Sequence, residues 1–83
     1  MKILYFSSVR EAIGLAEEEV EVPGHVRTAG DLARWLSGRS EGHARAFADL
    51  AHVRAAFDMA LCEMDTPLGT AREAAFFPPM TGG

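Results

Sequence analysis

The sequence predicts one α+β domain in which a main helix packs on one face of a mixed β-sheet. A length of 83 residues fits a single domain. Hydrophobic residues make up 48% of the chain, which is enough to build a packed core. Short stretches rich in β-forming residues lie on both sides of an amphipathic helical stretch, and the predicted order is β-β-α-(α)-β-β-β.

The first element, residues 2–8 (KILYFSS), is predicted to be a β-strand because it is rich in aliphatic and aromatic residues. Side chains alternate between the two faces of a strand. Ile3 and Tyr5 should therefore lie on one face, and Leu4 and Phe6 on the other.

Residues 9–14 (VREAIG) should form a short helical turn that ends at Gly14 in the left-handed conformation. In residues 17–23 (EEEVEVP), glutamate and valine alternate, which predicts a half-exposed strand that stops at Pro23. These elements predict a hairpin between the first two strands.

The main helix is predicted over residues 28–38. Thr28 can cap its first turn, Asp31 places a negative charge near its N-terminus, and Gly38 ends it. Its buried stripe should consist of Leu32, Trp35 and Leu36.

The second half of the chain should hold a shorter helix over 42–52 and three strands over 53–57, 60–63 and 73–77, with a turn at 65–69. The inward residues predicted for this shorter helix are Ala44, Phe47 and Leu50.

Charge and cysteine content narrow the class of partner. The net charge is −4, which argues against nucleic acid and is compatible with a basic protein surface. A lone cysteine cannot form an internal disulfide. The apolar run near the N-terminus is too short for a signal peptide core or a membrane span. We therefore expect a cytoplasmic protein without a membrane partner.

Side chains that could perform chemistry are few, and we find no phosphate loop, nucleophile elbow or metal-ligand spacing. His25, His43 and His52 are predicted to be exposed loop residues, and no metal site is expected. Cys62 is interpreted as an inert buried thiol rather than a nucleophile. The run EEEVE (17–21) is the solvated face of a strand, with an acidic docking surface as the alternative, and Trp35 belongs to the core.

The C-terminal sequence FFPPMTGG is the informative feature. Phe76 and Phe77 must be buried in a core or an interface, and the two prolines after them stiffen the chain. Residues 78–83 can reach about 20 Å at most. Glycine at positions 82 and 83 leaves the terminal carbonyl carbon unobstructed. Adenylation of that carboxylate, followed by displacement of AMP by sulfur, would give a thiocarboxylate.

Three motifs, KILYFSSVREAIG, DTPL and FFPPMTGG, resemble the small-subunit family of molybdopterin synthase, whose members are ubiquitin-like sulfur carriers with the β-grasp fold. The sequence departs from that family at Thr70-Ala71-Arg72-Glu73, where Asp-Gly-Asp-Glu is frequent, and at Asp58, where asparagine is common. The resemblance implies a β-grasp domain over 1–77 and a flexible tail over 78–83.

The resemblance also implies a mechanism. An activating enzyme adenylates the Gly83 carboxylate with Mg-ATP, a sulfur donor protein supplies sulfur, and no cofactor stays bound. The thiocarboxylate then donates sulfur to cyclic pyranopterin monophosphate on the synthase large subunit, which carries most of the active site, within a heterotetramer. The partner-binding residues that it implies are Phe6, Leu61, Phe77, Pro78, Pro79, Met80, Thr81 and Gly82.

Other functions remain open at this point. The chain could carry sulfur for thiamine, cysteine or tRNA thiolation, or it could be a ubiquitin-like modifier of lysines. A binding module with an idle glycine tail is a further alternative.

Overall fold

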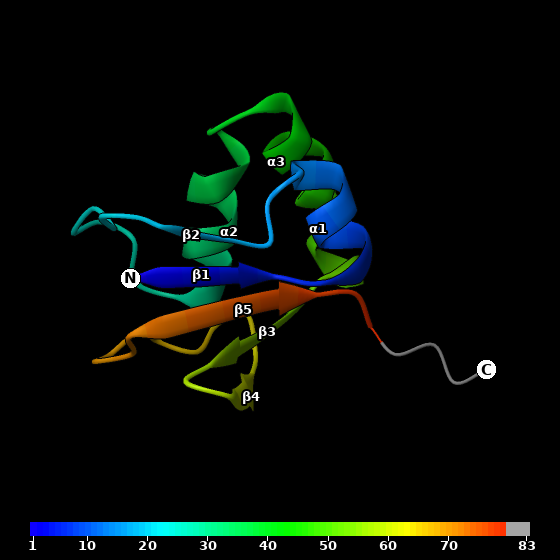
Figure 1. Cartoon of the computed structure of the whole chain (residues 1–83). Helices are drawn as coiled ribbons and strands as arrows, with labels where there is room; N and C mark the ends of the chain where they lie inside the picture. Colours follow the sequence, from blue (N-terminus) through cyan, green and yellow to red (C-terminus); the bar gives the residue numbers. More distant parts are fainter. Residues whose placement is uncertain (80–83) are drawn as a thin grey trace.

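The computed structural model describes residues 1–79, and within them a five-stranded mixed sheet is covered on one side by three α-helices (Figure 1). The elements in chain order are β1 (Lys2–Tyr5), α1 (Ser7–Ile13), β2 (Glu17–Glu19), α2 (Ala29–Ser37), α3 (Glu41–Ala46), the 3-10 helix η1 (Leu50–His52), β3 (Arg54–Phe57), β4 (Ala60–Cys62) and β5 (Glu73–Phe77). This arrangement confirms the predicted α+β class.

The strand order is β2-β1-β5-β3-β4, with β1 and β5 parallel and the other neighbours antiparallel. The hairpin of the first two strands is therefore confirmed, with α1 in its connection. Because β1 and β5 run in the same direction, the chain leaves β5 at the end of the sheet opposite to the N-terminus (Figure 1).

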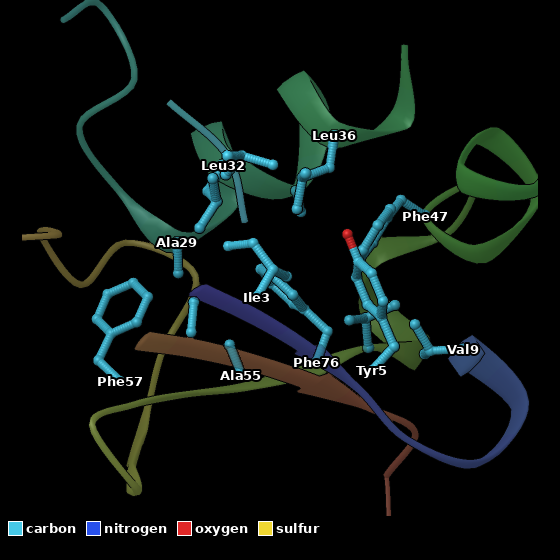
Figure 2. Packing of buried hydrophobic residues seen from close by; sticks show 14 of the residues in the cluster. Ile3, Tyr5, Val9, Ala29, Leu32, Leu36, Phe47, Ala55, Phe57 and Phe76 are labelled. Atoms are coloured by element: carbon cyan, nitrogen blue, oxygen red, sulfur yellow. The ribbon is translucent and has the colours of Figure 1, made fainter. Parts of the chain in front are cut away.

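The core lies between the sheet and the helices (Figure 2). The residues that the sheet contributes, all nearly inaccessible, are Ile3, Tyr5, Ala55, Phe57, Ala74 and Phe76. Leu32 and Leu36 of α2 pack onto them, and the Phe47 ring lies 5.1 Å from that of Phe76 in an edge-to-face arrangement. The predicted inward placement of Ile3 and Tyr5 is confirmed.

Helix α2 forms as the sequence predicts. The Thr28 hydroxyl accepts a hydrogen bond from the Asp31 amide (3.1 Å), and the Asp31 carboxylate accepts one from the Thr28 amide (3.3 Å). This capping box fixes the first turn. Trp35 is only half-buried, at the edge of the core, where the Arg39 guanidinium lies 5.5 Å from its ring.

The first strand is shorter than predicted. It ends at Tyr5, and α1 begins at Ser7 rather than at residue 9. Ser7 has a φ of 50°, so the chain turns sharply here, and the Phe6 carbonyl accepts hydrogen bonds from Val9 and Arg10. Gly14 ends α1 in the left-handed conformation, as expected.

Strand β2 covers only the first three residues of the predicted 17–23. The Val20 amide still donates to the Met1 carbonyl (2.9 Å), which is the last pairing with the β1 side. The remaining residues leave the sheet, although Val20 is buried and Val22 half-buried.

The helix predicted over 42–52 is interrupted. It divides into α3 and η1 because Phe47 turns into the core at the end of α3, and because the Asp49 carboxylate accepts from the Ala51 amide (3.1 Å) and starts a new turn. Phe47 is inward as predicted, but Ala44 is exposed.

Candidate functional site

The end of β5 leads directly to the C-terminal sequence. Phe77, Pro78 and Pro79 are half-buried at the edge of the domain. The other predicted site residues, Met80, Thr81, Gly82 and Gly83, lie outside the described residues. Their roles stay predictions.

A row of apolar residues crosses four strands on the sheet face that points away from the helices, which we call the open face. In the strand register, Leu4 lies beside Ala75, Ala75 opposite Ala56, and Ala56 opposite Leu61. Leu61 is 79% exposed, whereas Ala56 and Ala75 have small side chains that project little from the sheet. The row is an apolar surface on which a partner could pack.

Phe6 and Phe77 extend the open face toward the end of β5. The Phe6 amide donates to the Phe76 carbonyl (3.1 Å), so the pairing of β1 with β5 continues one residue beyond Tyr5. Because Tyr5 points into the core, Phe6 points to the open face, where it is 47% exposed. The structure thus brings Phe6, Leu61 and Phe77 to one face, while their role in docking stays a prediction.

A tight turn adds an exposed residue that the sequence reasoning missed. Asp58 and Met59, between β3 and β4, both have positive φ, and Met59 is 90% exposed. The Asp58 Oδ1 accepts hydrogen bonds from the amides of Arg72 and Glu73, each at 3.0 Å, and so holds the turn against the start of β5. An asparagine oxygen could accept the same bonds. The sequence signal that could have identified Met59 is a large apolar residue in the short turn between two predicted strands.

The acidic run is not simply a solvated face. Glu17 pairs with Lys2, and Glu19 pairs with the α-ammonium of Met1. Glu18 is only 14% exposed and points to the helix side, where its Oε2 lies 2.7 Å from His43 Nε2 and accepts a hydrogen bond from the Tyr5 hydroxyl (2.7 Å).

His43 is therefore buried, contrary to the prediction of an exposed loop residue, because α3 places it between Glu18 and the Ser40 hydroxyl (2.7 Å). Burial alone would raise the pKa of Glu18, but hydrogen bonds from His43 and Tyr5 outweigh it and hold that pKa below its usual value. Burial raises the pKa of Tyr5 far above its usual value, so its hydroxyl remains a donor.

The remaining titratable side chains form no reactive centre in the described part of the chain. His25 and His52 are exposed, as predicted. Cys62 is half-buried on β4, and burial raises the pKa of its thiol, which favours the unreactive form. Residues 1–79 hold no group of three or more His, Cys, Asp or Glu that could bind a metal ion.

Other features lie away from the open face. A solvent-open groove of about 510 Å³ lies between residues 20–27 and 68–71, at the N-terminal end of β1 and far from the exit of β5. Among the described helices none is both long and apolar enough to cross a membrane.

The strand order, the helices on one side and the final central strand that leads out of the sheet define a ubiquitin-like protein of the β-grasp class. The chain belongs to the ThiS family, whose model matches residues 3–83. It is accordingly a sulfur-carrier protein with the ubiquitin fold.

Its relatives agree with this assignment. The chain is 36% identical, over 83 residues, to the molybdopterin synthase sulfur carrier subunit of Escherichia coli (strain K12), with 100% of this chain and 99% of the relative covered. The crystal structure of SAMP1 from Haloferax volcanii is similar with a TM-score of 0.73 at 25% identity, over 99% of this chain and 97% of that one. A putative molybdopterin converting factor, subunit 1, from Pyrococcus furiosus shares the fold, with a TM-score of 0.63 at 22% identity and 95% of both chains covered.

Proposed function

We propose that this chain is the sulfur-carrier subunit of a molybdopterin synthase. The Gly83 carboxylate attacks the α-phosphorus of Mg-ATP on an activating enzyme, so that pyrophosphate leaves and an acyl-adenylate forms. A sulfur nucleophile supplied by a donor protein then attacks the carbonyl carbon, and AMP leaves. The thiocarboxylate donates its sulfur to cyclic pyranopterin monophosphate in the cytoplasm.

The observation that carries this proposal is the continuity between the open face and the C-terminal sequence. Leu4, Ala75 and Leu61 belong to an apolar surface on the sheet whose central strand, β5, leads into Pro78-Pro79. A partner that packs on this surface would sit beside the exit of the tail and could receive Gly83 in its own pocket.

The proposed partner on this surface is the synthase large subunit, in a heterotetramer with two copies of each chain. Phe6, Leu61 and Phe77 would anchor the contact, because large apolar side chains at the centre of an interface contribute most of its affinity. Pro78 to Gly82 would line the channel that leads to the active site of that subunit. In this scheme ATP and Mg²⁺ belong to the activating enzyme and do not stay bound to the carrier.

The intact mass of the protein tests the proposal. The full chain is incubated with the activating enzyme, Mg-ATP and a sulfur source, and the expected product is heavier by the difference between one sulfur and one oxygen atom. Omission of ATP is the control and should leave the mass unchanged. An unchanged mass in the complete mixture would refute the carrier role.

A second candidate function is that of a protein modifier, and the similarity to SAMP1, small archaeal modifier protein 1 of Haloferax volcanii, favours it. A modifier would appear in cell extract as isopeptide-linked conjugates on lysines of other proteins. Carriers for thiamine, cysteine or tRNA thiolation would form the same thiocarboxylate. They would differ in the acceptor that restores the unmodified mass.

A further inference from the structure

Arg54, the first residue of β3, lies beside the exit of β5. It is directly opposite Phe77 in the antiparallel pairing of these two strands. Opposite residues of such a pair point to the same face of a sheet, with their Cβ atoms about 5 Å apart. Because the next residue, Ala55, is buried in the core, Arg54 points the other way, onto the open face next to Phe77.

The guanidinium of Arg54 is oriented by the backbone but has no carboxylate partner in the described part of the chain. Its Nη1 donates to the carbonyls of Ala51 (3.2 Å) and Val53 (3.3 Å), just before β3. Asp49, the acidic residue of the preceding turn, lies 2.8 Å from Nδ1 of His52 instead. The other ion pairs among the described residues do not include Arg54 either. The Nε and Nη2 groups therefore keep N–H donors for a further acceptor.

A partner that packs on Phe77 must also cover this guanidinium. Arg54 and Phe77 are neighbours on the open face, and Phe6 lies on the other side of Phe77, since β5 runs between β1 and β3. Removing a charged group from water without a new partner costs far more than an apolar contact returns. A partner surface that is apolar throughout would therefore be disfavoured at this point.

We propose that the partner surface for the open face is apolar at its centre and carries a carboxylate where it meets Arg54. Arginine suits this contact because its planar N–H groups match the two oxygens of an Asp or Glu side chain in a bidentate pair. Such a pair fixes direction as well as distance, so it aligns the exit of β5 with the pocket of the partner. The inference rests on the proposed function, which makes that partner the synthase large subunit.

Calorimetric titration of the large subunit with the parent, Arg54→Gln and Arg54→Glu measures the contribution of this charge. Arg54→Gln should bind about fivefold more weakly at low salt, and Arg54→Glu more weakly still. The affinities of the parent and of Arg54→Gln should converge as salt is added, because salt screens the pair, whereas a merely structural role of Arg54 would give no such convergence. Arg72→Gln removes an exposed arginine at the other end of β5 and is the matched control, which should bind like the parent.

A zero-length cross-link locates the carboxylate. Lys2 is the only lysine of the chain, so Arg54→Lys adds an amine to a protein with almost no lysine background. In the complex, a water-soluble carbodiimide should join this amine to an Asp or Glu of the large subunit as an amide, with the loss of one water. Peptide mapping identifies both residues. Arg72→Lys, treated in the same way, should give no such link.

Two results would overturn this inference and leave the carrier function standing, provided that the parent binds. One is an affinity of Arg54→Glu equal to that of the parent. The other is the absence of any link from position 54 to a carboxylate of the large subunit. Failure of the parent itself to bind would instead refute the large subunit as the partner, and the inference with it.

Discussion

Replacing Phe6 with aspartate should separate docking from folding. Phe6 occupies the N-cap of α1, with extended backbone and no side-chain hydrogen bond to the helix. About half of its side chain is buried, and losing that burial costs about 0.8–1.6 kcal/mol. Aspartate is a favoured N-cap residue and should return about 0.5–2 kcal/mol. The free energy of unfolding should therefore remain nearly unchanged.

Binding should respond much more strongly. Phe6→Asp places a carboxylate on the apolar open face, and loss of an anchor residue of this kind commonly costs 2 kcal/mol or more, about thirtyfold in affinity. Phe77→Ala, which shortens the other aromatic of this face, should weaken docking in the same way. Calorimetric titration with a molybdopterin synthase large subunit measures the affinity, and thermal unfolding measures the stability.

Ala44→Asp provides the control for charge. Ala44 is exposed on α3, on the opposite side of the domain from the open face, and its replacement adds the same single negative charge. This variant should bind like the parent. Equal affinities for Phe6→Asp, Phe77→Ala and the parent would show that the open face is not the docking surface.

Three further predictions concern other parts of the chain. Gly42→Ala should destabilise the domain by about 1–3 kcal/mol, because the added Cβ would lie 2.4 Å from the backbone oxygen of Ala12 in α1. Gly38→Ala is the control, since its Cβ would make only an ordinary contact, and thermal unfolding compares the two variants. Deletion of Gly83 should abolish thiocarboxylate formation, read as intact mass, with an unchanged melting temperature, because moving the terminus by one residue shifts the carboxylate about 3.3 Å. The pKa of Glu18 is lower in the folded protein than in the unfolded chain, so the ionised carboxylate should stabilise the fold at pH values above its unfolded pKa of about 4.3. This stabilisation should be lost as the pH falls through the pKa of Glu18 in the folded protein. Urea unfolding against pH should show a flatter profile for Glu18→Gln, and an unaltered profile would contradict this.

The elements that could be predicted are those with a local signal. Helix α2 has its cap, its apolar stripe and its terminal glycine within eleven residues, and β5 ends in two aromatic residues of high β-propensity, Phe76 and Phe77. The start of α1 could not be predicted, because KILYFSS reads as one β-forming run and the turn at Ser7 depends on a positive φ at a residue with no special preference for it.

The open face could be predicted in part. The alternation of side chains along the first strand predicted that Phe6 lies on the other face of the sheet from Ile3 and Tyr5. The family resemblance identified Leu61 and Phe77 as partner-binding residues. The row through Ala56 and Ala75 required the register between strands, which no local pattern specifies.

The structure also gives a reason why a partner should approach along β4 rather than β2. The sheet has two edges, and an unpaired edge strand is a ready template for another chain unless charges protect it. The β2 edge carries three glutamates, whose partners lie far away in sequence: Glu18 reaches His43 across 25 residues. These long-range contacts fix β2 to the domain, and the ion pairs of Glu17 and Glu19 place charged groups along its edge. The β4 edge consists of Ala60–Cys62, without a charge, and Leu61 projects from it onto the open face. An apolar partner surface that approaches from β4 therefore meets an uncharged edge and the apolar row, and Arg54, opposite Phe77, is the charged residue beside the exit of β5, whereas the β2 edge presents paired charges.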